Sequence, residues 1–328
     1  MLRFILRRVA YMVPTLFAVS IVAFVIIQLP PGDYLTTLMA DWASGGGAVE
    51  MGTVEVLRER YGLDQPIWIQ YFYWIFGIVT RGDFGISFEL NRPVTDVIWG
   101  RLGYTFLISF CTLLFIWALA LPIGIYSAVK QYSIGDYVAT FFGFLGLAIP
   151  NFLLALVLMY VTVSYFGQSV GGLFSPAMVD APWSLMKFAD FLAHVWLPIL
   201  VVGTAGLASL IRIMRANLLD ELHKPYVTTA RAKGVSEFRL LLKYPVRVAL
   251  NPLISTLGWI LPALVSGEII VSVVLSLPTT GPMLLRALLA QDMYLAGSII
   301  LMVSVLTLVG TLVSDILLAI ADPRIRFQ

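Results

Sequence analysis

Long apolar runs separated by shorter polar segments make up most of this chain. Each run is close to or longer than the roughly 20 residues with which a helix crosses about 30 Å of hydrocarbon. The pattern predicts an all-α integral membrane protein with a single transmembrane domain over residues 1–328. The six predicted transmembrane helices cover approximately residues 9–29, 104–129, 137–166, 193–214, 253–276 and 296–320.

Prolines lie in or beside all of these predicted helices except the last. Membrane helices tolerate proline because neighbouring helices, Ser and Thr side chains or water satisfy the freed carbonyl groups. Kinked helices around a transport path and ordinary membrane-helix prolines are both consistent with this pattern. The five prolines are Pro14, Pro122, Pro150, Pro198 and Pro262.

Two longer polar segments interrupt the apolar pattern, over residues 30–103 and 215–252. Segment 30–103 carries nine acidic and five basic residues, with a glycine-rich tip at Gly45, Gly46 and Gly47. We interpret it as an extracytoplasmic insertion between helices 1 and 2. We expect it to contact a partner on that side of the membrane.

The second half of the insertion contains two more predicted elements. VEVLRERYGL predicts a short helix that ends at Gly62. The following QPIWIQYFYWIFGIV is rich in Trp and Tyr, whose rings favour the membrane–water interface. A seventh span here would move segment 215–252 outside, against its charge, so we interpret this stretch as a re-entrant or surface-lying helix.

Composition and charge agree with a membrane protein and set its orientation. The chain is 59% hydrophobic and 12% charged, whereas a soluble domain carries about 25% charged residues. The N-terminus has the basic start of a signal peptide, but its apolar stretch is too long and no cleavage site follows, which predicts a retained signal anchor. Cytoplasmic termini place 14 of the 21 Lys and Arg residues inside, as the positive-inside rule requires. Segment 215–252 is then cytoplasmic.

The longest strongly basic stretch is YVTTARAKGVSEFRLLLKYPVRVAL, residues 226–250. Glycine at 234 favours a helix end and Ser236 is a possible N-cap, so the sequence predicts two short helices joined at Gly234. Small residues here would permit close approach by a groove of another protein. On charge alone, a solvated loop that only fixes topology is the alternative. The side chains expected to fix a docked register are Arg231, Lys233 and Glu237.

This stretch resembles the coupling loop of binding-protein-dependent ABC-transporter permeases. Within these permeases it is similar to the peptide/nickel-type family, whose members usually have the pattern Y-x-x-T-A-R-A-K-G-L-S-E. Thr228 stands where the general permease pattern has a Glu, and Tyr244-Pro245 replaces a frequent Lys-His-Ala continuation. The resemblance implies docking of this loop on an ATPase. The residues that it assigns to ATPase coupling are Tyr226, Thr229, Ala230, Arg231, Ala232, Lys233, Gly234, Ser236 and Glu237.

The resemblance extends over nearly the whole chain. LRRVAYMVPTLFAVSIVAFVIIQLPPGD, RGDFGISF and the C-terminal DPRIRF are similar to successive parts of the family, and SIGDYVATFFGFLGLAIPNFLLAL carries Asp136, Pro150 and Phe152 in place. The chain resembles the first of the two homologous membrane components of dipeptide and oligopeptide transporters. This implies a type I ABC importer permease fold in a bacterial or archaeal cytoplasmic (inner) membrane, with multiple passes.

The resemblance also implies partners. They are a homologous second permease subunit, two cytosolic ATPase subunits that bind ATP and Mg, an extracytoplasmic solute-binding protein and the lipid bilayer, with no nucleic acid. The chain has no G-x-x-x-x-G-K-[ST] motif for a nucleotide of its own. We therefore expect no cofactor in this chain and a driving force that arrives by contact with the ATPases.

Ionisable groups inside a membrane are costly and often functional, and Glu268 in LVSGEIIVSVVL is the clearest of them. It either faces the path or pairs with a helix, or it snorkels toward the outer end. The family tends to have a Glu where Ser272 stands, so the substrate is uncertain from this stretch. The candidate path residues are Glu268, Ser272, Asn151 and Pro150. The candidate contacts to the binding protein are Gly45, Gly46, Gly47, Arg81 and Asp83.

No catalytic constellation or metal site stands out. His194 and His223 are too few and too far apart for a convincing metal site, and Cys111 is expected to be a buried apolar residue. We therefore expect a permease subunit, not an enzyme, that carries peptides or similar oligomeric solutes. The same machinery importing oligosaccharides, opines or metal chelates is the alternative. A stand-alone secondary transporter is a weaker alternative, because neither inverted repeats nor several midplane charges are clear.

Overall fold

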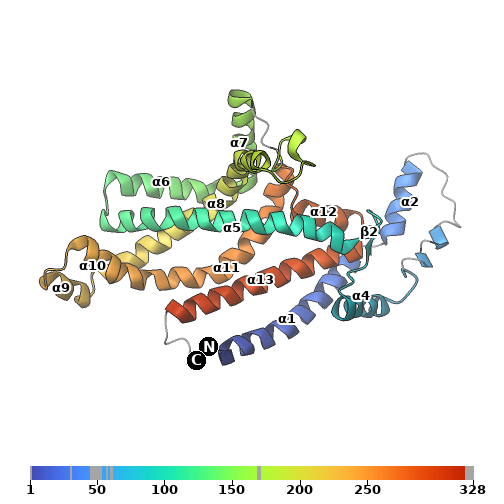
Figure 1. Cartoon of the computed structure of the whole chain (residues 1–328), viewed down its shortest axis with the longest axis horizontal. Helices are drawn as coiled ribbons and strands as arrows, with labels where there is room; N and C mark the ends of the chain where they lie inside the picture. Colours follow the sequence, from blue (N-terminus) through green and yellow to red (C-terminus); the bar gives the residue numbers. More distant parts are fainter. Residues whose placement is uncertain are drawn as a thin grey trace. The chain divides into compact units, whose positions relative to one another are not determined.

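The computed structural model describes residues 2–29, 32–44, 54–56, 58–59, 62–167 and 171–321; within its helices, the side chains of Leu2, 41–44, 258–259, 261–268 and Ala321 lie outside that description. This part of the chain is helical apart from one antiparallel ladder, β1 (Ile86–Ser87) with β2 (Arg92–Pro93) (Figure 1). The chain forms two compact units. The first contains Met1–Ile5, Phe106–Pro278 and Val309–Gln328, and the second contains Leu6–Thr105 and Thr279–Leu308.

The first unit is organised around α8 (Leu185–Leu222), a helix of 38 residues that contacts α6, α7 and α11. Its buried positions include Val201, Leu210, Met214 and Leu218, which recur at helical spacing on one face. The other elements of this unit are α5 (Val94–Val129) from Phe106 onward, α6 (Ile134–Ala148), α7 (Asn151–Phe166), η1 (Pro176–Met178), α9 (Pro225–Ala232), α10 (Glu237–Lys243), α11 (Pro245–Val274) and the end of α13 (Met293–Ala321).

Glycines bring α5 and α8 close together. A Cβ on Gly124 would lie 2.7 Å from the Met214 side chain, and one on Gly203 would lie 2.9 Å from the Phe115 ring. Neither distance leaves room for a side chain larger than hydrogen, because packed interiors have few voids to absorb added atoms. The two helices therefore pack through small residues, as membrane helices often do.

A buried lysine fastens the loop before α8 to the first turn of that helix. Ser184 caps α8 by accepting a hydrogen bond from the Lys187 amide, 3.2 Å. The Lys187 ammonium donates to the carbonyls of Val179 (3.0 Å) and Ala181 (2.6 Å) and lies 4.8 Å from the centre of the Phe174 ring. Burial of this charge is offset by these contacts.

The predicted span 137–166 differs from a single helix. It is divided into α6 and α7, whose axes are bent by 105°. Pro150 sits at the break as the N-cap of α7, and Ile149 is extended, with φ −83° and ψ 123°. A proline disfavours the helical conformation in the residue before it, which explains why α6 stops there. The proline thus separates two helices where the sequence suggested a kink.

The second unit encloses an aromatic core. It contains α1 (Leu2–Gln28) from Leu6 onward, α2 (Tyr34–Ser44), α4 (Ile67–Arg81), the β1–β2 ladder, the start of α5, α12 (Thr280–Leu289) and the first part of α13. Phe24 of α1 stacks on Trp74 of α4, with ring centres 5.7 Å apart, and Phe88 and Ile98 belong to the same buried cluster. Helix α4 ends at Gly82, whose φ of 65° permits the left-handed cap.

Four helices of the described chain are long and apolar enough to cross a membrane, or five if the bent α6–α7 pair is one span. The four single helices are Arg3–Gln28, Val94–Val129, Leu185–Leu222 and Met293–Ile320. The predicted span 253–276 falls in α11, which contains most of the side chains outside the description. The protein is therefore an all-helical membrane protein with four to five candidate spans.

Candidate functional site: the coupling segment and the insertion

Residues 215–252, the coupling segment, join α8 to α11 through the short helices α9 and α10 (Figure 1, left). Glu221, near the end of α8, accepts hydrogen bonds from the Lys224 ammonium, 2.6 Å, and from the Tyr226 hydroxyl. Partial burial, and then the bond to Glu221, raise the pKa of Tyr226, so its hydroxyl stays protonated as the donor. Glu221 thereby clamps the start of α9 onto the end of α8.

A small apolar core holds α9 against α10. Val227 and Ala230 from α9 and Leu240 from α10 are buried together, with Val235 and Tyr244 packed against them. Ala230, named above as a coupling residue, is only 8% exposed. Its methyl group therefore stabilises the segment from inside.

Gly234 joins the two helices, as the sequence predicts. Its φ of 74° lies in the left-handed region, which side chains other than Asn and Asp rarely adopt. A Cβ at this position would meet nothing within 4 Å. The backbone conformation therefore favours glycine, and the space in front of it is open.

Arg231 and Glu237 form an ion pair across the glycine. The Arg231 Nε and Nη2 donate to the two Glu237 carboxylate oxygens at 2.6 and 3.2 Å, and the two side chains are 53% and 67% exposed. The hydrogen bond from Arg231 lowers the pKa of Glu237. An exposed ion pair of this kind adds little to the stability of the fold. Its two charged groups remain accessible on the surface of the segment.

The remaining predicted coupling residues, Tyr226, Thr229, Ala232, Lys233 and Ser236, are all exposed. Thr229 donates its hydroxyl to the Pro225 carbonyl, 2.9 Å. Ser236 takes the N-cap position of α10 without a side-chain hydrogen bond to that helix among the described residues.

Two apolar side chains of α10 were missed by the sequence reasoning. Phe238 is 76% exposed and Leu242 is 45% exposed, one helical turn apart. Their spacing of four residues, away from the buried Leu240, was a signal that could have found them. Glu221 was also missed, although its spacing of three residues from Lys224 was a local signal for an ion pair.

The candidate path residues fall on two helices that contact one another, α7 and α11. Pro150 caps α7, Asn151 is its first residue, and Ser272 is fully buried near the end of α11. Glu268 lies in the helical backbone of α11, and its side chain lies outside the described residues.

In the insertion, Arg81 and Asp83 line one cavity of about 410 Å³ together with Gln65, Trp74 and Tyr294. Asp83 accepts a hydrogen bond from the Gly85 amide at 2.9 Å. The predicted tip, Gly45, Gly46 and Gly47, lies outside the described residues. The structure thus brings Arg81 and Asp83 to one hollow of the second unit.

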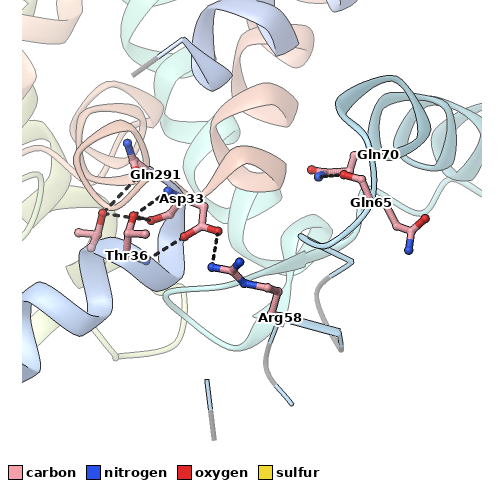
Figure 2. A network of polar contacts seen from close by, with 7 residues as sticks. Asp33, Thr36, Arg58, Gln65, Gln70 and Gln291 are labelled. Carbon is pink, nitrogen blue, oxygen red and sulfur yellow. Dashed lines mark hydrogen bonds and ion pairs between the residues drawn. The ribbon is translucent and has the colours of Figure 1, made fainter. Parts of the chain in front are cut away.

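A polar network orders the start of the insertion, and Figure 2 shows Asp33 between Thr36 and Arg58. The Thr36 amide donates to Asp33 Oδ1 at 2.8 Å, and the Asp33 amide donates to the Thr36 hydroxyl at 2.7 Å. This reciprocal arrangement caps α2. Arg58 Nη2 lies 3.5 Å from Asp33 Oδ2, and the Thr37 hydroxyl donates to Gln291 at 3.2 Å.

A buried carboxylate ties the β1 turn to the start of α13. Asp292 is fully buried and accepts hydrogen bonds from the Ser87 hydroxyl (2.6 Å) and from the amides of Glu89 (3.2 Å) and Leu295 (3.1 Å). Burial raises the pKa of Asp292, and these hydrogen bonds oppose the rise.

Comparisons with known proteins cover the whole chain. Residues 120–327 match the family described as "Binding-protein-dependent transport system inner membrane component", and residues 1–109 match its N-terminal family. The chain is 35% identical over 328 residues to the oligopeptide transport system permease protein AppB of Bacillus subtilis, covering 100% of both chains. It is 31% identical over 344 residues to the dipeptide transport system permease protein DppB of Escherichia coli. It is also 31% identical over 328 residues to the glutathione transport system permease protein GsiC of the same species. Both alignments cover 100% of both chains.

These matches confirm the resemblance stated from the sequence. The chain belongs to the inner membrane components of binding-protein-dependent transport systems, as a peptide-type permease subunit in an inner membrane.

Proposed function

We propose that this chain forms half of the translocation path of an ABC importer for peptides or similar oligomeric solutes. The coupling segment carries this proposal: two short helices joined at Gly234, with exposed groups on both, next to a membrane domain. The relatives named above carry oligopeptides, dipeptides and glutathione, all of them peptides, which supports the substrate class. Oligosaccharides, opines and metal chelates are the alternative substrates for the same machinery.

The proposed topology has six transmembrane helices and the type I importer permease fold. Helix α11 supplies the sixth span, because its 30 residues extend about 45 Å at 1.5 Å per residue. The bent α6–α7 pair counts as one. Both termini and the coupling segment are cytoplasmic, in a bacterial or archaeal membrane, and residues 30–103 are extracytoplasmic.

The proposed partners are a homologous second permease subunit, two ATPase subunits and an extracytoplasmic solute-binding protein. ATP and Mg would be bound by the ATPase subunits and not by this chain. Closure of the ATPase pair would displace α9 and α10 and so alternate access to the path. Exposed Phe238 and Leu242 beside the Arg231–Glu237 pair support a docking surface, because an apolar pair outside the membrane gains by burial in a partner's groove.

Specific roles follow for the residues named from the sequence. Pro150, Asn151, Glu268 and Ser272 are proposed to border the path at the contact of α7 with α11. The insertion is proposed to receive the binding protein through Gly45, Gly46 and Gly47 and through Arg81 and Asp83. The cavity beside Arg81 supports this role, since a hollow with mixed charges and aromatic walls suits a protruding side chain.

Co-expression of the tagged chain with the transport proteins encoded beside it tests the proposal. We expect two ATPase subunits and a second permease to copurify, and reconstituted vesicles to take up labelled peptides only with ATP and binding protein. Competition by oligosaccharides or metal chelates, with none by peptides, would move the substrate to the alternative. Uptake by this chain alone, driven by an ion gradient, would replace the proposal with a secondary transporter.

A further inference from the structure

Helices α6 and α8 pack against each other, and a cavity that α5 also borders lies along their contact. At one end a Cβ on Gly146 would lie 2.6 Å from the Thr204 side chain, so the helix backbones approach closely there. Toward the other end, α5, α6 and α8 border an apolar cavity of about 560 Å³, lined among others by Tyr126, Gly135 and Ile211. Beyond that cavity, one polar cluster joins the helices.

That cluster is centred on Asp136 in the first turn of α6, which is 2% exposed. Arg215 of α8 donates to it through Nε, 3.0 Å to Oδ1, and through Nη2, 2.9 Å to Oδ2. The carboxylate also accepts from the Ser127 hydroxyl at the end of α5 and from the Tyr132 amide, 2.9 Å. A forked arginine fixes both distance and angle between the groups that it joins, which one hydrogen bond cannot do.

Arg215 stands close to the coupling segment's clamp. It precedes Glu221 by six residues of the same uninterrupted helix, a rise of about 9 Å. Glu221 holds Lys224 and Tyr226 at the start of α9. At its other end α6 leads directly to the 105° bend and α7. A continuous series of rigid elements and polar contacts therefore runs from α9 to the bend at Pro150.

We propose that the Arg215–Asp136 pair is the positioning link through which displacement of α9 and α10 moves α6 and, with it, the α6–α7 bend. This inference rests on the proposed docking of the coupling segment on ATPases. The cavity beside α6 supports it, because an apolar void between helices transmits a displacement poorly. Of the close contacts at Gly146 and at Asp136, the second involves the coupling segment directly, through its first residue, Arg215.

The test separates a link from a merely structural pair. The single variant Arg215→Gln leaves the buried Asp136 carboxylate unpaired, and Asp136→Asn leaves the partly buried Arg215 guanidinium unpaired; both are expected to lower assembly. The double variant Asp136→Asn with Arg215→Gln removes both charges and leaves neither group as an unpaired charge, so we expect it to assemble better than the single variants. The measurement is solute uptake per ATP hydrolysed by the complete transporter in vesicles, together with the yield of assembled complex.

We expect the double variant to assemble and hydrolyse ATP like the unaltered transporter, while uptake per ATP falls about fivefold or more. Unchanged uptake per ATP in the double variant would overturn the proposal. If the double variant does not assemble, Arg215→Lys decides: it keeps the charge and loses the fork, and the proposal requires a smaller but measurable fall. An unchanged ratio for Arg215→Lys would overturn it equally.

Lys187→Gln is the matched control, since it removes a buried cation contact at the opposite end of α8. It should lower the yield of complex and leave uptake per ATP unchanged. A chain that does not copurify with ATPases even without substitution would instead defeat the proposed function, which keeps the two failures apart.

Discussion

At the scale of single residues, Gly234 and Ala230 have opposite functions in the same short segment. Gly234 has the positive φ that joins α9 to α10 and leaves open space around its Cα. Ala230 faces inward against Leu240. The proposed docking surface would therefore consist of some of the motif's residues, while others support it from beneath.

Gly234 can be substituted to separate backbone conformation from close approach. Gly234→Asn tolerates positive φ, whereas Gly234→Ala is strained by about 1–2 kcal/mol. If only conformation matters, Asn should keep ATPase binding and Ala should weaken it. If a partner's groove approaches the glycine, both variants should lose copurification of the ATPases, and Gly234→Asp should abolish transport while membrane insertion stays intact. Normal transport by Gly234→Asp would contradict the docking of this segment.

At the scale of elements, Pro150 makes two helices of one apolar stretch. The extended backbone at Ile149 and the 105° bend leave the start of α7 as a helix end inside an apolar part of the chain. Continuous α8 carries Pro198 without such a break, so a proline alone does not decide the angle. At Pro150 the extended backbone of Ile149 is combined with packing of both α6 and α7 against α8.

Pro150→Leu should let α6 and α7 straighten toward one helix. Spin labels at exposed Val138 and Tyr160 would lie roughly 20 Å apart along two helices at this bend and about 33 Å apart on a straight helix. We expect electron–electron double resonance to show a longer distance in Pro150→Leu. Pro198→Leu in α8 should leave this distance unchanged, and an unchanged distance in Pro150→Leu would show that packing alone holds the bend.

Asp292 gives the second unit a pH dependence with a definite sign. Its pKa in the folded protein is raised by burial, so the folded state binds more protons than the unfolded state above about pH 3.9. Stability from this group is therefore present below that pH and is lost as pH rises through the raised pKa. The melting temperature of the unaltered protein should fall relative to Asp292→Asn as the pH is raised from about 4. If the melting temperature of the unaltered protein instead stays constant or rises relative to that of Asp292→Asn as the pH increases, this account is contradicted.

At the scale of the whole molecule, the two proposed contact sites for partner proteins lie in different units. The coupling segment belongs to the first unit and the insertion to the second. A substitution in the insertion should therefore leave ATPase binding intact, and a substitution in the coupling segment should leave contact with the binding protein intact. This separation gives the remaining prediction.

Deleting Ala43–Gly47 should impair delivery by the binding protein more than ATPase assembly. The measurement compares ATPase copurification with stimulation of ATP hydrolysis by loaded binding protein. We expect the first to be retained and the second to fall. Normal stimulation would remove the role of the tip in receiving that protein.

Structural features that depend only on residues close together in the sequence were predictable. The length of the apolar runs predicts the long helices, and Gly234 predicts the α9–α10 junction because its φ is a local property. The bend at Pro150 was signalled only as a kink, since the angle depends on what the two helices pack against. The pairs Arg215–Asp136 and Ser87–Asp292 join residues 79 and 205 positions apart, and no local pattern contains such distances.

The bond between Ser87 and Asp292 has a consequence for biosynthesis. Its two residues are separated by 205 positions, which a ribosome needs roughly 10 to 40 s to translate. During that interval the β1 turn has already been made and lacks the carboxylate that orders it. A nascent chain truncated before Asp292 should therefore be an early target for membrane proteases, while one extended past Leu295 should escape them.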